Sequence, residues 1–172
     1  DLLARLRRWD HRMDRNEAEP LVFMAWLHAM HRALYADELG DLYDSVPTLA
    51  PSVVKRMLTE RTTWCDDVTT DDTEDCAAAV NTALTIALTD LVDRYGENPD
   101  EWRWGEAHTA PLANQVFGRI PILAGLVSNA VETDGGHFTV NRGGFYGAED
   151  GQPFAHTHGA GFRADAPANI RR

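Results

Sequence analysis

One change of pattern along the chain constrains its fold more than any other feature. Apolar residues recur at helical spacing over about residues 1–130, and after Asp134-Gly135-Gly136 the chain changes to strand-like runs bounded by glycine. The first such run is Phe138–Arg142, in which bulky and polar side chains alternate, and the second leads to Arg163. We therefore expect an α+β fold, mostly helical and then closing with a short antiparallel β unit.

The helical part is expected to hold several amphipathic segments within a single domain covering residues 1–172. Its longest helix should begin at an N-cap on Thr73 and stop at Gly96, because these residue types favour those positions. Pro20 and Pro51 suit the first turns of two others. From the apolar spacing, helices are predicted over about residues 2–13, 21–36, 51–58, 74–95 and 121–131.

Charge and hydropathy disfavour several classes of partner. The net charge is −11, from 27 acidic and 16 basic residues, so the surface should repel nucleic acid and anionic membranes. No apolar run approaches the roughly 18 to 20 residues that span a bilayer. The chain starts on Asp1 without a methionine and stops soon after Arg163, and we interpret it as part of a longer protein.

Cys65 and Cys76 are the only two cysteines, and they flank an acidic turn. A disulfide between them would close a short loop and contribute about 2 to 3 kcal/mol by the loop-entropy estimate. The alternative is a pair of unrelated thiols.

Acyl transfer needs a nucleophile, a base and donors for the developing oxyanion. The three serines, Ser45, Ser52 and Ser128, stand in no recognisable nucleophile motif, so we expect no nucleophile in this chain. His108 is a candidate general base, with a hydrogen-bonded structural histidine as the alternative.

An aromatic cluster, Trp102, Trp104 and Phe117, could line an apolar acyl pocket. The plainer interpretation is that these rings belong to the core.

A zinc-dependent hydrolase or metal-binding module is a rival interpretation. It rests on histidines and acidic residues around the two strand-like runs, namely His137, His156, His158, Glu149 and Asp150. His28 and His31, three residues apart on a helix, form a weaker candidate pair and are more often solvent-facing. A third interpretation is a non-catalytic helical interaction module.

Four segments, in order, resemble the penicillin amidase family of N-terminal nucleophile hydrolases. Thr139-Val140-Asn141 resembles its TVN segment, and His158 to Arg163 resembles its HGaSyR segment, with Gly161 where the family usually has serine. Trp102 to His108, followed by Phe117 to Leu123, is similar to the WxWGxxH…PxL segment. Leu6 to Asp14 is similar to a helix of the family.

The resemblance implies specific roles. The fold would be part of the family's αββα sandwich, and the nucleophile would be an N-terminal serine upstream of this segment. Asn141 would donate its amide to the oxyanion, and Arg163 would orient Asn141 or face the substrate. The alternatives are an asparagine that satisfies a local turn and an arginine paired with Asp165.

The resemblance also implies a context. The parent enzyme would hydrolyse an amide bond of a hydrophobic acyl group in a periplasmic or secreted location. The segment has no cofactor of its own, and any calcium would bind largely outside it. Its partners would be the rest of the β-chain, the α-chain and a small-molecule amide, and alone it would be inactive. A two-stranded unit is marginal, so the helices must carry the core or the segment must dimerise.

Overall fold

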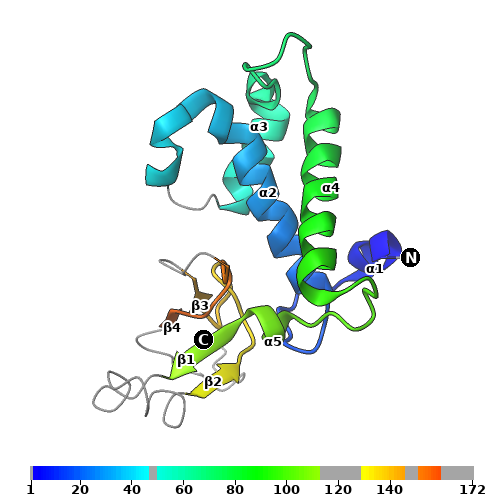
Figure 1. Ribbon diagram of the computed structural model, residues 1–172, viewed down its shortest axis with the longest axis vertical. Helices are drawn as coiled ribbons and strands as arrows, with labels where there is room; N and C mark the ends of the chain where they lie inside the picture. Colours follow the sequence, from blue (N-terminus) through cyan, green and yellow to red (C-terminus); the bar gives the residue numbers. More distant parts are fainter. Residues whose placement is uncertain (1, 47–49, 113–128, 146–150, 160–172) are drawn as a thin grey trace, which may run out of the picture. The chain divides into compact units, whose positions relative to one another are not determined.

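The computed structural model describes residues 2–46, 50–112, 129–145 and 151–159, and the chain divides into two compact units (Figure 1). The helical unit comprises Asp1–His11 and Glu17–Trp102, and the β unit comprises Arg12–Asn16 and Arg103–Arg172. The α+β class is confirmed. The single-domain organisation stays a prediction.

The helical unit contains four α-helices and two short 3₁₀ helices among its described residues. They are α1 (Leu2–Arg8), α2 (Glu19–Leu39), η1 (Gly40–Ser45), α3 (Pro51–Glu60), η2 (Thr62–Cys65) and α4 (Cys76–Tyr95). Pro20 and Pro51 occupy the first turns of α2 and α3, as predicted.

Helices α2 and α4 lie side by side along their length and form the core of this unit (Figure 1). The buried residues of α4 recur every four positions, at Ala79, Ala83, Ala87 and Leu91. Three of these are alanines, whose small side chains let the two backbones approach closely. The Trp26 indole donates to the Val80 carbonyl oxygen at 3.2 Å and ties the two helices together.

Helix α4 is long and apolar enough to cross a membrane by length and composition alone, which corrects the expectation that no run approaches that length. Only 22% of its apolar window is buried in the described structure. The exposed side of α4 nevertheless carries Asn81, Thr82, Thr85 and Thr89, and its buried side contacts α2. A helix that packs a soluble core meets the same criterion, so this is weak support for a membrane span.

The N-terminal helix is shorter than its pattern predicted. Helix α1 ends at Arg8, and His11 has a φ of 64°, which a continuing helix does not allow. Trp9 and Met13 therefore do not extend the stripe of α1. Met13 is instead buried in the β unit, where its carbonyl oxygen accepts a hydrogen bond from the Gly135 N–H at 2.8 Å.

The start of α4 also differs from the prediction, because Asp75 and not Thr73 caps it. The Asp75 carboxylate accepts from the Ala78 N–H at 2.8 Å, and Cys76 begins the helix. Gly96 follows its last residue, as expected. Thr73 lies outside the helix, and next to it the Asp66 carboxylate accepts from the Glu74 N–H at 2.8 Å.

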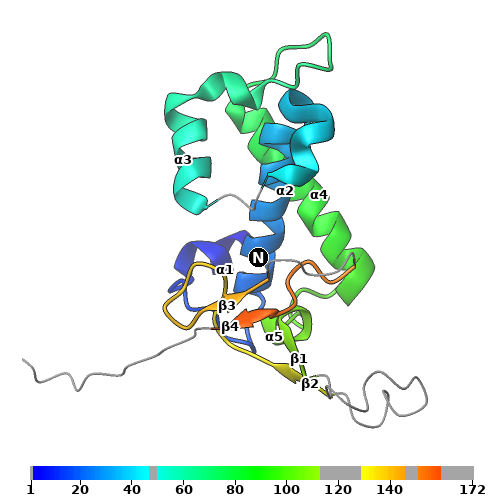
Figure 2. The same ribbon diagram turned by 90° about the vertical axis from the view of Figure 1, so that its left-hand side faces the viewer.

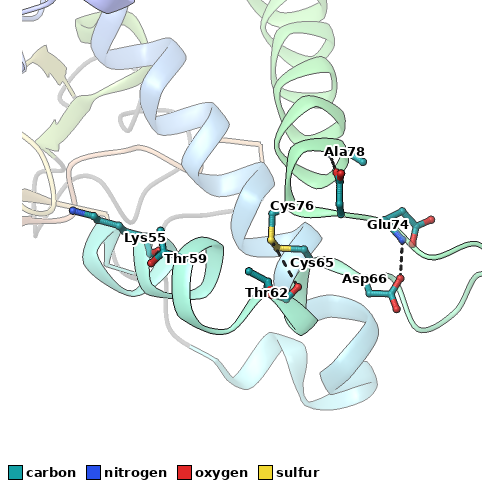
Figure 3. Close-up of a disulfide and its surroundings, with 9 residues drawn as sticks. Lys55, Thr59, Thr62, Cys65, Asp66, Glu74, Cys76 and Ala78 are labelled. Carbon is teal, nitrogen blue, oxygen red and sulfur yellow. Dashed lines mark hydrogen bonds between the residues drawn. A yellow bond between two sulfur atoms is a disulfide. The ribbon is translucent and has the colours of Figure 1, made fainter.

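A disulfide joins Cys65, at the end of η2, to Cys76, at the start of α4 (Figure 3). Their Cα atoms lie 4.9 Å apart. The loop between them is further held by the Glu74 carboxylate, which accepts from the Asp67 N–H at 3.1 Å. The acidic turn is thus an ordered part of the helical unit.

The β unit contains one short helix and two antiparallel strand pairs among its described residues (Figure 2). Its elements are α5 (Trp104–Ala107), β1 (Thr109–Leu112), β2 (Asn129–Glu132), β3 (Gly143–Gly144) and β4 (His158–Gly159). In the first pair Thr109 lies opposite Glu132, and in the second Gly143 lies opposite Gly159.

Two assignments of secondary structure in this region were wrong. Residues 138–141 form turns and bends rather than a strand, Arg142 forms only an isolated bridge, and the strand β3 is Gly143-Gly144. Asn129–Glu132 is β2, although the helix predicted over residues 121–131 ran into it; residues 121–128 lie outside the described residues. In both places pairing with a distant segment decides the conformation, and local periodicity does not detect it.

Candidate functional site

Asn141 lies near the end of a loop that closes between Gly136 and Gly143. The Gly143 N–H donates to the Gly136 carbonyl oxygen at 3.1 Å, and Gly136 forms an isolated parallel bridge with Arg142. The Thr139 hydroxyl lies inside this loop, where it accepts from the Gly136 N–H at 2.9 Å and lies 2.8 Å from the Asn141 carbonyl oxygen. The backbone on both sides of Asn141 is therefore fixed, and Asn141 itself is exposed.

Gly135 gives this loop the space it needs. Its φ is 89°, a conformation that favours glycine, and an added Cβ would collide with the Asn141 carbonyl oxygen. The same Cβ would lie 3.2 Å from the Asn141 side-chain nitrogen, so the amide packs directly over Gly135. The Gly135 carbonyl oxygen accepts from the buried Trp104 indole at 2.8 Å. Gly135 is therefore a position where the absence of a side chain allows the Asn141 loop to close.

An ion pair between Arg15 and Asp134 holds the chain just before this loop. The Arg15 guanidinium donates to both carboxylate oxygens of Asp134, at 2.9 and 2.7 Å, and to the Glu132 carbonyl oxygen at 2.8 Å. The hydrogen bonds from Arg15 lower the pKa of Asp134 to about 2. No local pattern predicts this pair, since 119 positions separate its members.

His108 lies fully buried in the β unit, immediately after α5. The Trp104 ring stacks on it with centroids 4.5 Å apart, and the His156 ring stacks on it at 5.0 Å. Its Nδ1 lies 2.7 Å from the Phe154 carbonyl oxygen, which can only accept, so Nδ1 carries the proton. Its backbone oxygen accepts from the Thr133 hydroxyl at 2.9 Å.

Burial keeps His108 neutral and lowers its pKa to about 4, with the nearby His156 acting in the same direction. Its Nε2 is buried without a hydrogen-bond partner among the described residues. A Cβ added at Gly143 would collide with this Nε2, so the ring edge lies directly against the Gly143 backbone. This geometry favours a structural histidine over a general base.

The histidines of the zinc interpretation do not gather around one point. The Thr133 hydroxyl lies 2.9 Å from His156 Nδ1, and the Thr157 hydroxyl lies 2.9 Å from His158 Nδ1. His137 is buried against Phe145, with burial as the main cause of its lowered pKa. No group of three or more His, Cys, Asp or Glu residues that could hold a metal occurs in residues 2–46, 50–112, 129–145 and 151–159. Glu149 and Asp150 lie outside these ranges.

The other candidates from the sequence have mixed outcomes. Trp102 and Trp104 are both buried, which confirms the core interpretation for them, and Phe117 lies outside the described residues. His31 is buried and its Nδ1 lies 2.8 Å from the Tyr43 hydroxyl, so the expectation of a solvent-facing pair was wrong for it; His28 is exposed. Arg163, Asp165 and Gly161 lie outside the described residues as well, so the role of Arg163 stays a prediction.

Comparison with known proteins assigns the sequence to a family. The sequence model of the family described as penicillin amidase matches residues 1–166, which is nearly the whole chain. The chain belongs to the penicillin amidase family. Two curated relatives, each named acyl-homoserine lactone acylase QuiP, come from Pseudomonas syringae pathovars.

The relative from pathovar syringae strain B728a is 25% identical over 160 residues, which is 84% of this chain and 19% of the relative. The relative from pathovar tomato strain DC3000 is 24% identical over 161 residues, with the same coverage. This member of the penicillin amidase family thus spans about a fifth of the length of the relatives it matches. The activity of the whole protein is therefore a matter for proposal.

Proposed function

We propose that this chain supplies the oxyanion-binding part of an amidohydrolase that acts on an amide carrying a hydrophobic acyl group. Catalysis would run through an acyl-enzyme on an N-terminal serine outside this chain. Asn141 would donate its side-chain N–H to the carbonyl oxygen as negative charge develops there. Arg163 would orient Asn141 or the substrate. The family match and the relatives named as acylases support this class of reaction.

The observation that carries the proposal is the way in which the Asn141 loop is built. A donor stabilises an oxyanion most when it is held in place before the reaction begins, because no energy is then spent on orienting it. The proposal is supported by the Thr139 hydroxyl bonds and the absence of a side chain at Gly135, which fix the backbone that carries Asn141. Asn141 as a residue is exposed in the described structure, which is compatible with this role.

The substrate to test first is an N-acyl homoserine lactone, since both relatives are named for that activity. Penicillins with a hydrophobic side-chain amide would be the second class. The segment by itself should hydrolyse neither, because the three serines of the chain include no N-terminal nucleophile.

The deciding experiment is Asn141→Ala in the full-length protein, assayed for release of the amine product. Removing one oxyanion donor should lower kcat about 10²- to 10³-fold with little change in KM. Asn81→Ala is the matched control, because Asn81 lies on the exposed side of α4. A kcat in Asn141→Ala equal to that of the control would refute the oxyanion role.

A further inference from the structure

The buried histidine of the β unit has contacts that no part of the proposed reaction uses. His108 is fully buried and stacks with Trp104 and His156, so its ring plane is fixed. Its Nδ1–H donates to the Phe154 carbonyl oxygen at 2.7 Å, in the segment that leads to β4. Its opposite edge, Nε2, faces Gly143 in β3.

The contact with Gly143 depends on a missing side chain. The Cβ that would collide with His108 Nε2 takes the place of one hydrogen on the Gly143 Cα, so that hydrogen points at the nitrogen lone pair. A Cα–H group is a weak donor to such a lone pair. A protonated Nε2 would instead place an N–H and a buried charge against this backbone, which is unfavourable.

Gly143 is two residues after Asn141, and its N–H closes the Asn141 loop onto Gly136 at 3.1 Å. In the segment that leads to β4, the His156 N–H donates to the Thr109 carbonyl oxygen at 2.9 Å and the Thr157 N–H donates to the Gly144 carbonyl oxygen at 2.8 Å. The His108 imidazole thus contacts Gly143 in β3 and also Phe154 and His156 in the segment that leads to β4.

We propose that His108 is a positioning residue for Asn141: its neutral ring, seated against Gly143 and bound to Phe154, fixes the end of the loop that presents the Asn141 amide. This inference rests on the proposed oxyanion role of Asn141. His108 does not touch substrate in this scheme. Its contribution is to set where the amide lies, so it should affect kcat more than KM.

The test is a double-mutant cycle in the full-length protein with Gly143→Ala and His108→Asn. Asparagine keeps a short N–H donor for the Phe154 carbonyl oxygen but lacks the Nε2 edge, so it leaves room for an alanine Cβ. Gly143→Ala alone should lower kcat at least 10-fold with KM within about 3-fold. His108→Asn alone should lower kcat about 3- to 10-fold. The double variant should match His108→Asn, because the collision is gone.

Gly159→Ala is the matched control, since Gly159 lies opposite Gly143 in the strand pair and its added Cβ would make only an ordinary contact, at 3.7 Å from His156 Nε2. Its kcat should stay within about 2-fold of wild type. If Gly143→Ala gives no soluble protein, the double variant should restore it, and failure to restore it would overturn the proposal.

The outcomes distinguish the positioning role of His108 from the proposed oxyanion role of Asn141. If the reductions in kcat caused by Gly143→Ala and His108→Asn multiply in the double variant, while Asn141→Ala is strongly impaired, the positioning role of His108 is overturned. The proposed function then still stands. An unimpaired Asn141→Ala would overturn the proposed function and the positioning role together. A double variant that equals His108→Asn, with kcat lowered and KM kept, is the result we expect.

Discussion

The two units of the chain are stabilised in different ways. The helical unit depends on apolar packing between α2 and α4, where small buried side chains repeat every four residues, and on one disulfide. The described part of the β unit has only two short strand pairs and depends on missing side chains: Gly135 and Gly143 admit atoms where a Cβ would collide. Packing tolerates gradual change in volume, whereas a close backbone contact does not.

The largest effect should come from adding one methyl group to the β unit. Gly135→Ala combines a φ of 89° with a collision at the Asn141 carbonyl oxygen, and we expect a loss of about 3 to 5 kcal/mol in local stability. Gly96→Ala is the matched control, because its φ is 90° and nothing lies within 4 Å of the added Cβ. It should cost about 1 to 2 kcal/mol. Hydrogen exchange of peptides from each unit in the full-length protein would measure both, and equal losses would show that close contact adds nothing.

In the helical unit, the effect should follow burial along a single helix. Leu91 is fully buried in α4, and Leu91→Ala should cost about 2 to 4 kcal/mol through the cavity it leaves. Ile86 in the same helix is 52% exposed, and Ile86→Ala should change stability by only about 0.5 kcal/mol. Urea-dependent hydrogen exchange of α4 would compare the two variants. A similar loss in both would mean that the outer side of α4 is covered in the whole protein.

Removal of the disulfide should have a smaller effect that stays within the helical unit. Replacing Cys65 and Cys76 by serine should lower the stability of the region around η2 and the start of α4 by about 2 to 3 kcal/mol, because the open chain gains entropy when unfolded. Exchange in the Asn141 loop should be unchanged. Faster exchange in both units would show that the bridge supports more than its own loop.

The pH dependence should be the smallest effect and should appear in the β unit. Burial lowers the pKa of His108 to about 4 in the folded state, below its ordinary value of about 6.5. The titratable groups near its ring are His156 and Asp134. The unfolded state therefore binds more protons below pH 6.5, and stability should fall by about 1 to 3 kcal/mol as pH falls from about 6.5 to about 4. In His108→Asn, this loss of stability between about pH 6.5 and about pH 4 should be smaller, as measured by amide hydrogen exchange at a series of pH values. The exposed His11 offers the control, since His11→Asn should leave the slope in place.

The sequence by itself determined the α+β class, the family, the proline starts of α2 and α3, and the stop of α4 at Gly96. These features depend on residues close together in the chain, whose spacing and conformational preferences act locally. The cysteine spacing likewise indicated a Cys65–Cys76 disulfide, with two unrelated thiols as the alternative.

Only the tertiary structure decided how the candidate site is held. The strand expected over residues 138–142 became a loop, because Gly143 pairs with Gly159 and Thr139 bonds its own loop. His108 was a possible base from the sequence, yet its stacking with His156 and its contact with Gly143 come from segments tens of residues away. Burial and close contact between distant segments set its charge and position, and no local pattern records them.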